Sequence, residues 1–176
     1  MKKTALLSML LAFALILGYV EALIPLPFGV PGMKLGLPNL AVLITMYRFG
    51  NKEALTVNVA RVFLGGFLFG NLSAVLYSPS GALVNFLVML AIKRLPCFSI
   101  TGVSVAGGTA HNCAQLVVAM LVVQTYQTIY YLPFLLVSGC ITGLCLGLTA
   151  GRVMNACRPG EVIYKDCLQL WKEPNG

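Results

Sequence analysis

The stretch at residues 129–152, IYYLPFLLVSGCITGLCLGLTAGR, decides the fold class. It runs from Ile129 to Gly151 without a charged residue and then reaches Arg152. A helix that crosses a bilayer needs about 20 mostly apolar residues, and its backbone polar groups must all be paired within the helix. The stretch therefore predicts a transmembrane helix with a basic residue at one end.

The rest of the chain repeats this pattern. Hydrophobic residues make up 59% of the 176 residues and charged residues only 10%, and the mean hydropathy is +0.88. An ordinary soluble domain has about 25% charged residues, so the composition predicts an all-α integral membrane protein. We expect a six-helix bundle whose spans lie at 4–24, 36–49, 53–70, 74–92, 101–124 and 129–151.

The basic residues lie in alternate connections between these apolar runs. Ten of the 12 Lys and Arg precede the first run or follow the second, fourth and sixth runs: Lys2, Lys3, Arg48, Lys52, Lys93, Arg94, Arg152, Arg158, Lys165 and Lys172. The other connections carry only Lys34. Because basic residues are retained on the cytoplasmic side, the pattern predicts six crossings of the cytoplasmic membrane with both termini cytoplasmic. We therefore assign the net charge of +7 to topology and expect no nucleic acid partner.

Two segments allow another topology. The first run could be a signal peptide, with Val20-Glu21-Ala22 as its cleavage site, but its apolar stretch is longer than a typical signal core. The second run is short and could be re-entrant, but this would move the basic residues after later runs outside. We therefore expect an uncleaved first helix, a membrane domain at 1–152, and a cytoplasmic or interfacial tail at 153–176.

The connection at 25–38 has four prolines and three glycines. Proline fixes φ, whereas glycine permits positive φ, so this segment is shaped by its sequence. It is also apolar. It could pack onto the bundle as a lid, or it could be a turn that only needs helix breakers.

Small residues recur every four positions in several spans, which allows helices to approach closely in a membrane. The last span has such a stripe at Gly139, Gly143, Gly147 and Gly151, the fifth has one at Gly102, Ala106, Ala110 and Ala114, and the first has Ser8 and Ala12 beside Ala14, Gly18 and Ala22. These stripes could serve packing within the bundle. Alternatively, one of them, with the first span as our candidate, could dock another membrane subunit.

Polar side chains at membrane depth are costly and often mark function. Arg61 and Asn58 share a face of the third span, Asn85 lies in the middle of the fourth, and the fifth span carries three such residues: His111, Asn112 and Gln115. Glu21 and Lys34 could form a second, outer cluster.

Two interpretations of these polar residues are open. They could be structural, with Arg61 paired to helix carbonyls or Glu53 and the amides hydrogen bonded between helices. They could instead line a ligand pocket in which Arg61 or Lys34 faces an anionic or carbonyl-bearing group.

Catalysis has little support. The chain has one aspartate, Asp166, and four glutamates, with no nucleophile triad and no phosphate-binding loop. A Mg²⁺–diphosphate enzyme needs several carboxylates around its metal. We expect no catalytic residue, metal site or cofactor, and we interpret the six cysteines as structural.

Three motifs resemble a known family. They are Pro31-Gly-Met-Lys-Leu-Gly-Leu-Pro-Asn39, Ala60-Arg-Val-Phe-Leu-Gly-Gly-Phe-Leu-Phe-Gly70 and Val103-Ser-Val-Ala-Gly-Gly-Thr-Ala-His-Asn112. In this order they resemble the Gx transporter family, also labelled heptaprenyl diphosphate synthase component I. That family is similar to the S components of energy-coupling-factor vitamin transporters, which are six-helix membrane proteins. The resemblance covers about residues 5–155.

The resemblance implies ligand binding by the loop that contains Lys34 and Asn39. It also implies docking of a transmembrane coupling subunit, with its ATPases, at Ser8 and Ala12. Our first hypothesis is therefore the substrate-binding subunit of a small-molecule transporter for a vitamin or cofactor precursor. The alternatives are a non-catalytic accessory subunit of polyprenyl diphosphate or quinone synthesis, and a component of a membrane electron-transfer assembly.

Overall fold

The computed structural model describes residues 2–23, 36–69, 72–95, 97–124 and 126–157. Every regular element in these ranges is a helix. The elements are α1 (Lys2–Leu23), α2 (Asn39–Arg48), α3 (Asn51–Phe69), α4 (Leu72–Lys93), α5 (Ile100–Val123), the short 3₁₀ helix η1 (Tyr126–Tyr131) and α6 (Leu132–Cys157). The six expected spans thus correspond to the six α-helices, which makes the all-helical fold class correct.

The largest departure from the expected bounds concerns the last span. Its first residues form η1 rather than α-helix, and α6 continues to Cys157, past the expected boundary at 152. The rest of the tail, 158–176, and most of the connection at 25–38 lie outside the described residues.

Three helical segments are long and apolar enough to cross a membrane: Lys3–Leu23, Ile100–Val122 and Tyr126–Ala156. The chain is therefore a helical membrane protein. α2 has 10 residues, which at 1.5 Å per residue span about 15 Å, half of a typical hydrocarbon core.

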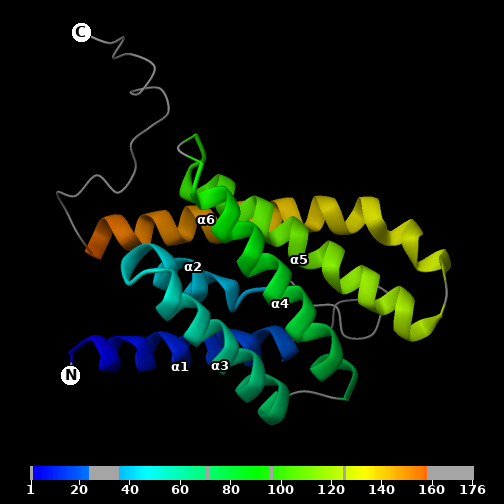
Figure 1. The fold of residues 1–176 in the computed structure, drawn as a ribbon, viewed down its shortest axis with the longest axis horizontal. Helices are drawn as coiled ribbons and strands as arrows, with labels where there is room; N and C mark the ends of the chain where they lie inside the picture. Colours follow the sequence, from blue (N-terminus) through cyan, green and yellow to red (C-terminus); the bar gives the residue numbers. More distant parts are fainter. Residues whose placement is uncertain (1, 24–35, 70–71, 96, 125, 158–176) are drawn as a thin grey trace, which may run out of the picture.

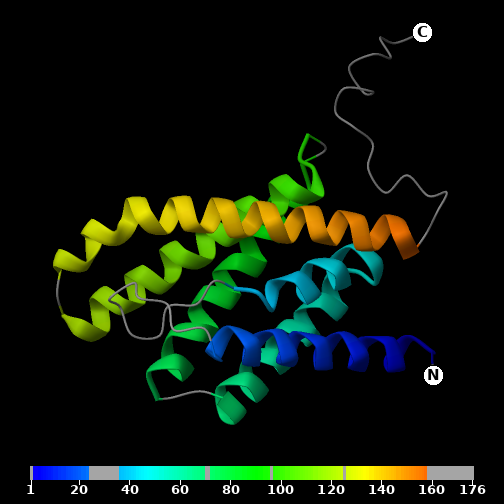
Figure 2. The same ribbon diagram turned by 180° about the vertical axis from the view of Figure 1, so that it is seen from behind.

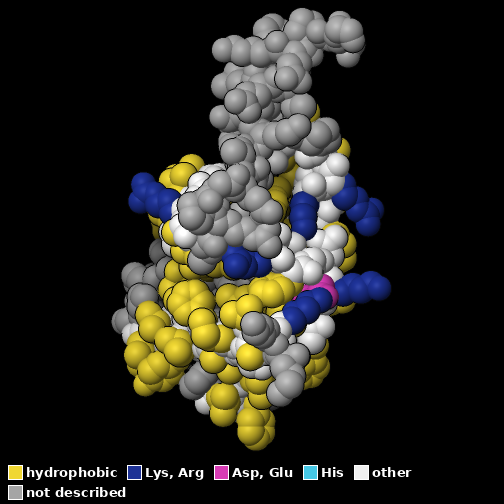
Figure 3. All heavy atoms as spheres, turned by 90° about the vertical axis from the view of Figure 1, so that its left-hand side faces the viewer, with side chains coloured by type: hydrophobic (Ala, Val, Ile, Leu, Met, Phe, Trp, Pro, Cys, Tyr) yellow, Lys and Arg dark blue, Asp and Glu magenta, His cyan; other side chains and the backbone are white. Residues whose placement is uncertain are grey.

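Successive helices alternate in direction, with α3 and α4 inclined to the long axis of the molecule (Figures 1 and 2). α1 begins at the end of the molecule where α2 and α6 finish, and α5 finishes at the opposite end, where α6 begins. Lys and Arg side chains gather at the first of these ends, whereas apolar side chains cover much of the surface beside it (Figure 3). We call this the basic end.

The short helix α2 is the centre of the packing. It contacts α1, α3 and α6, and its residues from Asn39 to Met46 are all buried. Leu43 and Met46 join Met89 of α4 and Met154 of α6 in the main core cluster. α2, which is too short to cross a membrane alone, is thus enclosed by longer helices.

Lys93 at the end of α4 fixes the turn between α2 and α3. Its Nζ donates to the carbonyl oxygen of Met46 at 2.7 Å and to Oδ1 of Asn51 at 3.1 Å, and it lies 4.8 Å from the centroid of the Tyr47 ring. A cation beside the final carbonyls of a helix satisfies acceptors that have no partner within the helix.

Three glycines of the α6 stripe let α6 pack tightly against α5. A Cβ at Gly139, Gly143 or Gly147 would lie 2.9, 2.6 or 2.7 Å from a Cα atom of α5. The stripe does not extend to Gly151, where an added Cβ would meet nothing within 4 Å.

The α5 surface that meets these glycines differs from the small-residue stripe expected at Gly102, Ala106, Ala110 and Ala114. It carries Thr101, Val105 and Thr109. The Cβ of an alanine at Gly102 would instead meet Phe98, ahead of the helix. Gly108 is the α5 glycine in this contact, since a Cβ there would lie 2.8 Å from the carbonyl oxygen of Gly139.

Candidate functional site

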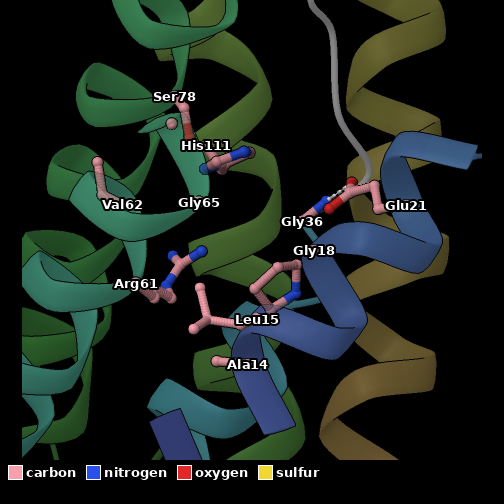
Figure 4. Close-up of a pocket in the computed structure, with 12 residues that line it drawn as sticks. Ala14, Leu15, Gly18, Glu21, Gly36, Arg61, Val62, Gly65, Ser78 and His111 are labelled. Carbon is pink, nitrogen blue, oxygen red and sulfur yellow. Dashed lines mark hydrogen bonds between the residues drawn. The ribbon is translucent and has the colours of Figure 1, made fainter. Parts of the chain in front are cut away.

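A small cavity lies where α1, α3 and α5 meet the residues just before α2 (Figure 4). Its volume is about 40 Å³, enough for about two or three water molecules. The residues that line it are Ala14, Leu15, Gly18, Glu21, Gly36, Pro38, Arg61, Val62, Gly65, Gly66, Ser78 and His111. A drug-sized ligand needs roughly 300–1,000 Å³, so the cavity as it stands fits only one chemical group of such a ligand.

Arg61 brings a positive charge into this cavity. Its side chain is buried, and its Nε donates to Oδ1 of Asn58 at 3.0 Å while Nη2 donates to Oδ1 of Asn39 at 2.6 Å. Asn58 is held in turn by a bond from its Nδ2 to the carbonyl oxygen of Ala82 at 3.1 Å. Both acceptors of the guanidinium are therefore neutral amides.

The expected alternative partner of Arg61, Glu53, lies elsewhere. Its carboxylate accepts a hydrogen bond from Lys3 at 2.5 Å, and this pair is partly exposed. The pairing of Arg61 with Glu53 that the structural interpretation suggested is thus wrong. The Lys3–Glu53 pair instead joins the first turns of α1 and α3.

Glu21 of α1 supplies the negative charge nearest to Arg61 in this site. Its buried side chain lines the same cavity, attracts the guanidinium electrostatically, and accepts a hydrogen bond from the backbone N–H of Gly36 at 2.5 Å (Figure 4). Lys34, the expected partner of Glu21, lies outside the described residues. Glu21 thus borders the Arg61 cavity, and its expected cluster with Lys34 stays a prediction.

The backbone conformation at position 36 requires a glycine. Its φ of +84° lies in the region that favours glycine. An added Cβ would lie 2.7 Å from Nδ2 of Asn39 and 3.7 Å from Cδ2 of His111. The backbone therefore passes between these two side chains while its N–H points at Glu21.

His111 comes to the cavity from α5. It is buried and packs against Gly81 of α4, where an added Cβ would lie 2.7 Å from Cε1 and 2.8 Å from Nδ1 of the ring. The same Cβ would also lie 2.9 Å from Cγ of Gln115. Gly81 thus makes room for His111, a role that sequence reasoning missed although an isolated glycine inside a helix is a recognisable signal.

The remaining predicted polar residues lie between helices, outside the cavity lining. Asn85 faces Gly107 of α5, where an added Cβ would lie 2.3 Å from its Oδ1, and Gln115 lies at the same α4–α5 interface. Asn112 donates from Nδ2 to the carbonyl oxygen of Leu135 in α6 at 3.0 Å. Asn112 therefore connects two helices and Asn85 and Gln115 pack at the α4–α5 interface, whereas Arg61 and His111 line the cavity. Asn39 lies beside it, bonded to Arg61.

The two faces of α1 differ. Ala14 and Gly18 point toward the cavity, and an added Cβ at Gly18 would lie 3.5 Å from Cγ of Pro38. Ser8 and Ala12, the predicted docking residues, are exposed on the surface of α1.

The side chains that border the cavity can form hydrogen bonds and ion pairs with a bound group. One guanidinium, one carboxylate, one imidazole and the hydroxyl of Ser78 border it. No cluster of three or more His, Cys, Asp or Glu that could hold a metal occurs among the described residues. The arrangement can pair with an anionic group that enters beside Arg61.

A family model described as heptaprenyl diphosphate synthase component I matches residues 10–153. No curated protein and no solved structure matches the chain.

Proposed function

The chain belongs to the heptaprenyl diphosphate synthase component I family, and we propose that it is a membrane-embedded subunit that binds a small anionic molecule through Arg61. In this proposal it serves a transporter for a vitamin-like compound or cofactor precursor. It has no nucleotide-binding motif, so transport energy comes from a separate coupling subunit and its ATPases.

The observation that carries the proposal is the environment of Arg61. A buried charge is costly unless it is paired, and inside a bilayer such residues commonly mark a substrate path. The guanidinium is buried, yet its hydrogen bonds go to the amides of Asn58 and Asn39. A carboxylate or phosphate of a ligand would offset the charge and could form two parallel hydrogen bonds with the guanidinium.

We further propose six membrane crossings with both termini in the cytoplasm. The alternating helix directions in Figures 1 and 2 support this topology, as does the gathering of basic side chains at one end. In this orientation the Arg61 cavity lies away from the basic end, on the outer side of the bundle centre.

The exposed face of α1 supports a docking role. Ser8 and Ala12 are one turn apart and exposed, and small residues allow a second helix to approach closely. A transmembrane coupling subunit is therefore the partner we propose for this face.

The test is mass spectrometry of small molecules released from protein purified in mild detergent. We expect one compound that carries a carboxylate or phosphate to be enriched in the wild type and lost in Arg61→Gln. Lys93→Gln is the matched control, because Lys93 is a partly buried cation outside the cavity lining, and it should retain the compound.

Arg61→Lys separates binding from folding, because it keeps the charge but loses the two-pronged geometry. If Arg61→Lys is as stable as the wild type and releases less of the compound, the binding role is supported. Equal enrichment in wild type, Arg61→Gln and Arg61→Lys would refute the site.

A second candidate comes from the family description. A synthase component without the carboxylates that hold Mg²⁺–diphosphate would be a non-catalytic accessory subunit. Release of a polyprenyl diphosphate or quinone, together with co-purification of a soluble synthase, would favour this accessory role. Loss of membrane electron transfer on deletion would favour the third hypothesis.

A further inference from the structure

A second and larger hollow lies on the surface of the bundle, near the basic end. Its volume is about 560 Å³, and we call it the α1–α6 groove. α1 contributes the side chains of one wall between Leu6 and Ile16, Leu40 and Ile44 of α2 form the floor, and Thr149 and Val153 of α6 form the other wall. The groove exists because α1 and α6 both pack against the short helix α2.

The length of the groove matches one leaflet of a bilayer. Leu6 and Ile16 are ten residues apart on one helix, which corresponds to about 15 Å at 1.5 Å per residue. The hydrocarbon core is about 30 Å thick. The groove therefore covers about the depth of the acyl chains in a single leaflet.

The groove has one cation in its lining, Arg48, which is the last residue of α2. Arg48 is exposed and makes no hydrogen bond or ion pair among the described residues. The one hydroxyl in the lining, of Thr149, donates to the carbonyl oxygen of Cys145 in its own helix at 2.8 Å. Among the described residues, the polar chemistry available to an occupant is thus the guanidinium of Arg48.

We infer that this groove binds an anionic phospholipid of the cytoplasmic leaflet, with one acyl chain along α2 and its phosphate at Arg48. The inference rests on the proposed membrane orientation, which places the basic end at the cytoplasmic surface, and not on the proposed small-molecule ligand. A guanidinium matches the geometry of a phosphate. Ala12 lines this groove and also belongs to the α1 face proposed for a coupling subunit, so the lipid occupies the groove of the chain alone and a coupling subunit would displace it. A helix of another subunit would cover the apolar walls, but it would not require a cation at the headgroup level.

The experiment is native mass spectrometry of the full chain after delipidation and incubation with equal amounts of phosphatidylglycerol and phosphatidylcholine. One basic residue near a membrane surface contributes about 1 kcal/mol to the binding of anionic lipid, so we expect about a fivefold preference for phosphatidylglycerol. Arg48→Ala should lose this preference and still bind lipid. Lys52→Ala removes an exposed basic residue that does not line the groove and should behave as the wild type.

A second variant tests where the acyl chain of the lipid lies. Thr149→Trp adds a large apolar side chain to an exposed wall residue, so the protein should fold and bind less of both lipids. A photoreactive residue in place of Phe13, which lines the groove, should form adducts with lipid when the protein is in membranes.

The lipid site is overturned by a wild type without preference, by equal losses in Arg48→Ala and Lys52→Ala, or by unchanged lipid binding in Thr149→Trp. It is also overturned if the photoreactive residue at position 13 forms no lipid adduct when the purified chain is alone in vesicles. Arg61 does not line this groove, so Arg61→Gln should retain the lipid preference. Failure of the small-molecule site therefore leaves the lipid result unaffected.

Discussion

Arg61 on α3 donates from Nη2 to Oδ1 of Asn39, the first residue of α2, at 2.6 Å. This bond joins a long helix to the start of the short central one, beside the cavity. The acceptor is an amide, although a carboxylate of the same shape would have paired the charge. An amide at position 39 thus positions the guanidinium without neutralising it.

Asn39→Asp should therefore weaken ligand binding without unfolding the protein. The new carboxylate would pair with Arg61 and compete with the anionic group of the ligand, so we expect affinity to fall at least about tenfold, or about 1.4 kcal/mol. Thermal unfolding in detergent should show unchanged or higher stability. Undiminished affinity in a folded Asn39→Asp protein would contradict the anionic-ligand proposal.

Asn112→Asp is the matched control for this change. Asn112 donates to the carbonyl oxygen of Leu135, and a carboxylate cannot replace that donor. Loss of this buried hydrogen bond, with a carboxylate oxygen placed against the carbonyl oxygen, should cost about 1–3 kcal/mol of stability. An aspartate should thus be tolerated at position 39 and damaging at position 112.

Glu21→Gln should have the opposite effect on affinity. A glutamine keeps an oxygen that can accept from the N–H of Gly36 but removes the negative charge that attracts Arg61. An anionic ligand would then face an uncompensated guanidinium, so its affinity should rise in a binding titration with the released compound. A fall in affinity with intact folding would show that the Glu21 carboxylate itself contacts the ligand.

The sequence predicted the helices well because each apolar run is bounded by charges or by helix breakers. It also placed Asn58 and Arg61 together, since residues three apart share a helix face. It could not identify Asn39 as the acceptor of Arg61, because that contact depends on how α2 is seated among its neighbours.

The orientation of α5 was likewise not predictable from the sequence. His111 and Asn112 are adjacent in sequence, yet His111 borders the cavity while Asn112 bonds to α6. Successive side chains on a helix point about 100° apart. Which of them faces the cavity depends on the rotation of α5, and that is set by Gly81 and the glycines of α6.

Gly143→Ala should destabilise the bundle, whereas Gly151→Ala should not. A Cβ at position 143 would lie 2.6 Å from Cα of Val105 and 2.8 Å from the carbonyl oxygen of Ser104, both backbone atoms. Overpacking costs about 1–3 kcal/mol, partly offset by the better helix propensity of alanine. Unfolding by denaturing detergent should separate the two variants, and equal stability would disprove the tight α5–α6 contact.

Lys93→Met should destabilise the protein more than Glu53→Gln. Lys93 donates to the carbonyl oxygen of Met46 and to the amide oxygen of Asn51, and loss of such charged hydrogen bonds costs about 1.5–3 kcal/mol. The Lys3–Glu53 pair is exposed to solvent on the lysine side and contributes little. Unfolding by denaturing detergent measures the stability of both variants. A larger loss of stability in Glu53→Gln than in Lys93→Met would contradict this assignment.

The proposed topology can be decided by labelling at two positions. Cys97 is exposed between α4 and α5, and Gln127 is exposed in η1. In a chain whose other five cysteines are replaced, six crossings place Cys97 in the cytoplasm, so a membrane-impermeant maleimide should label it only after the cells are opened. With Cys97 also replaced, Gln127→Cys should react on intact cells. If α2 does not cross, every later connection changes sides, so Cys97 would react from outside and Gln127→Cys would be protected.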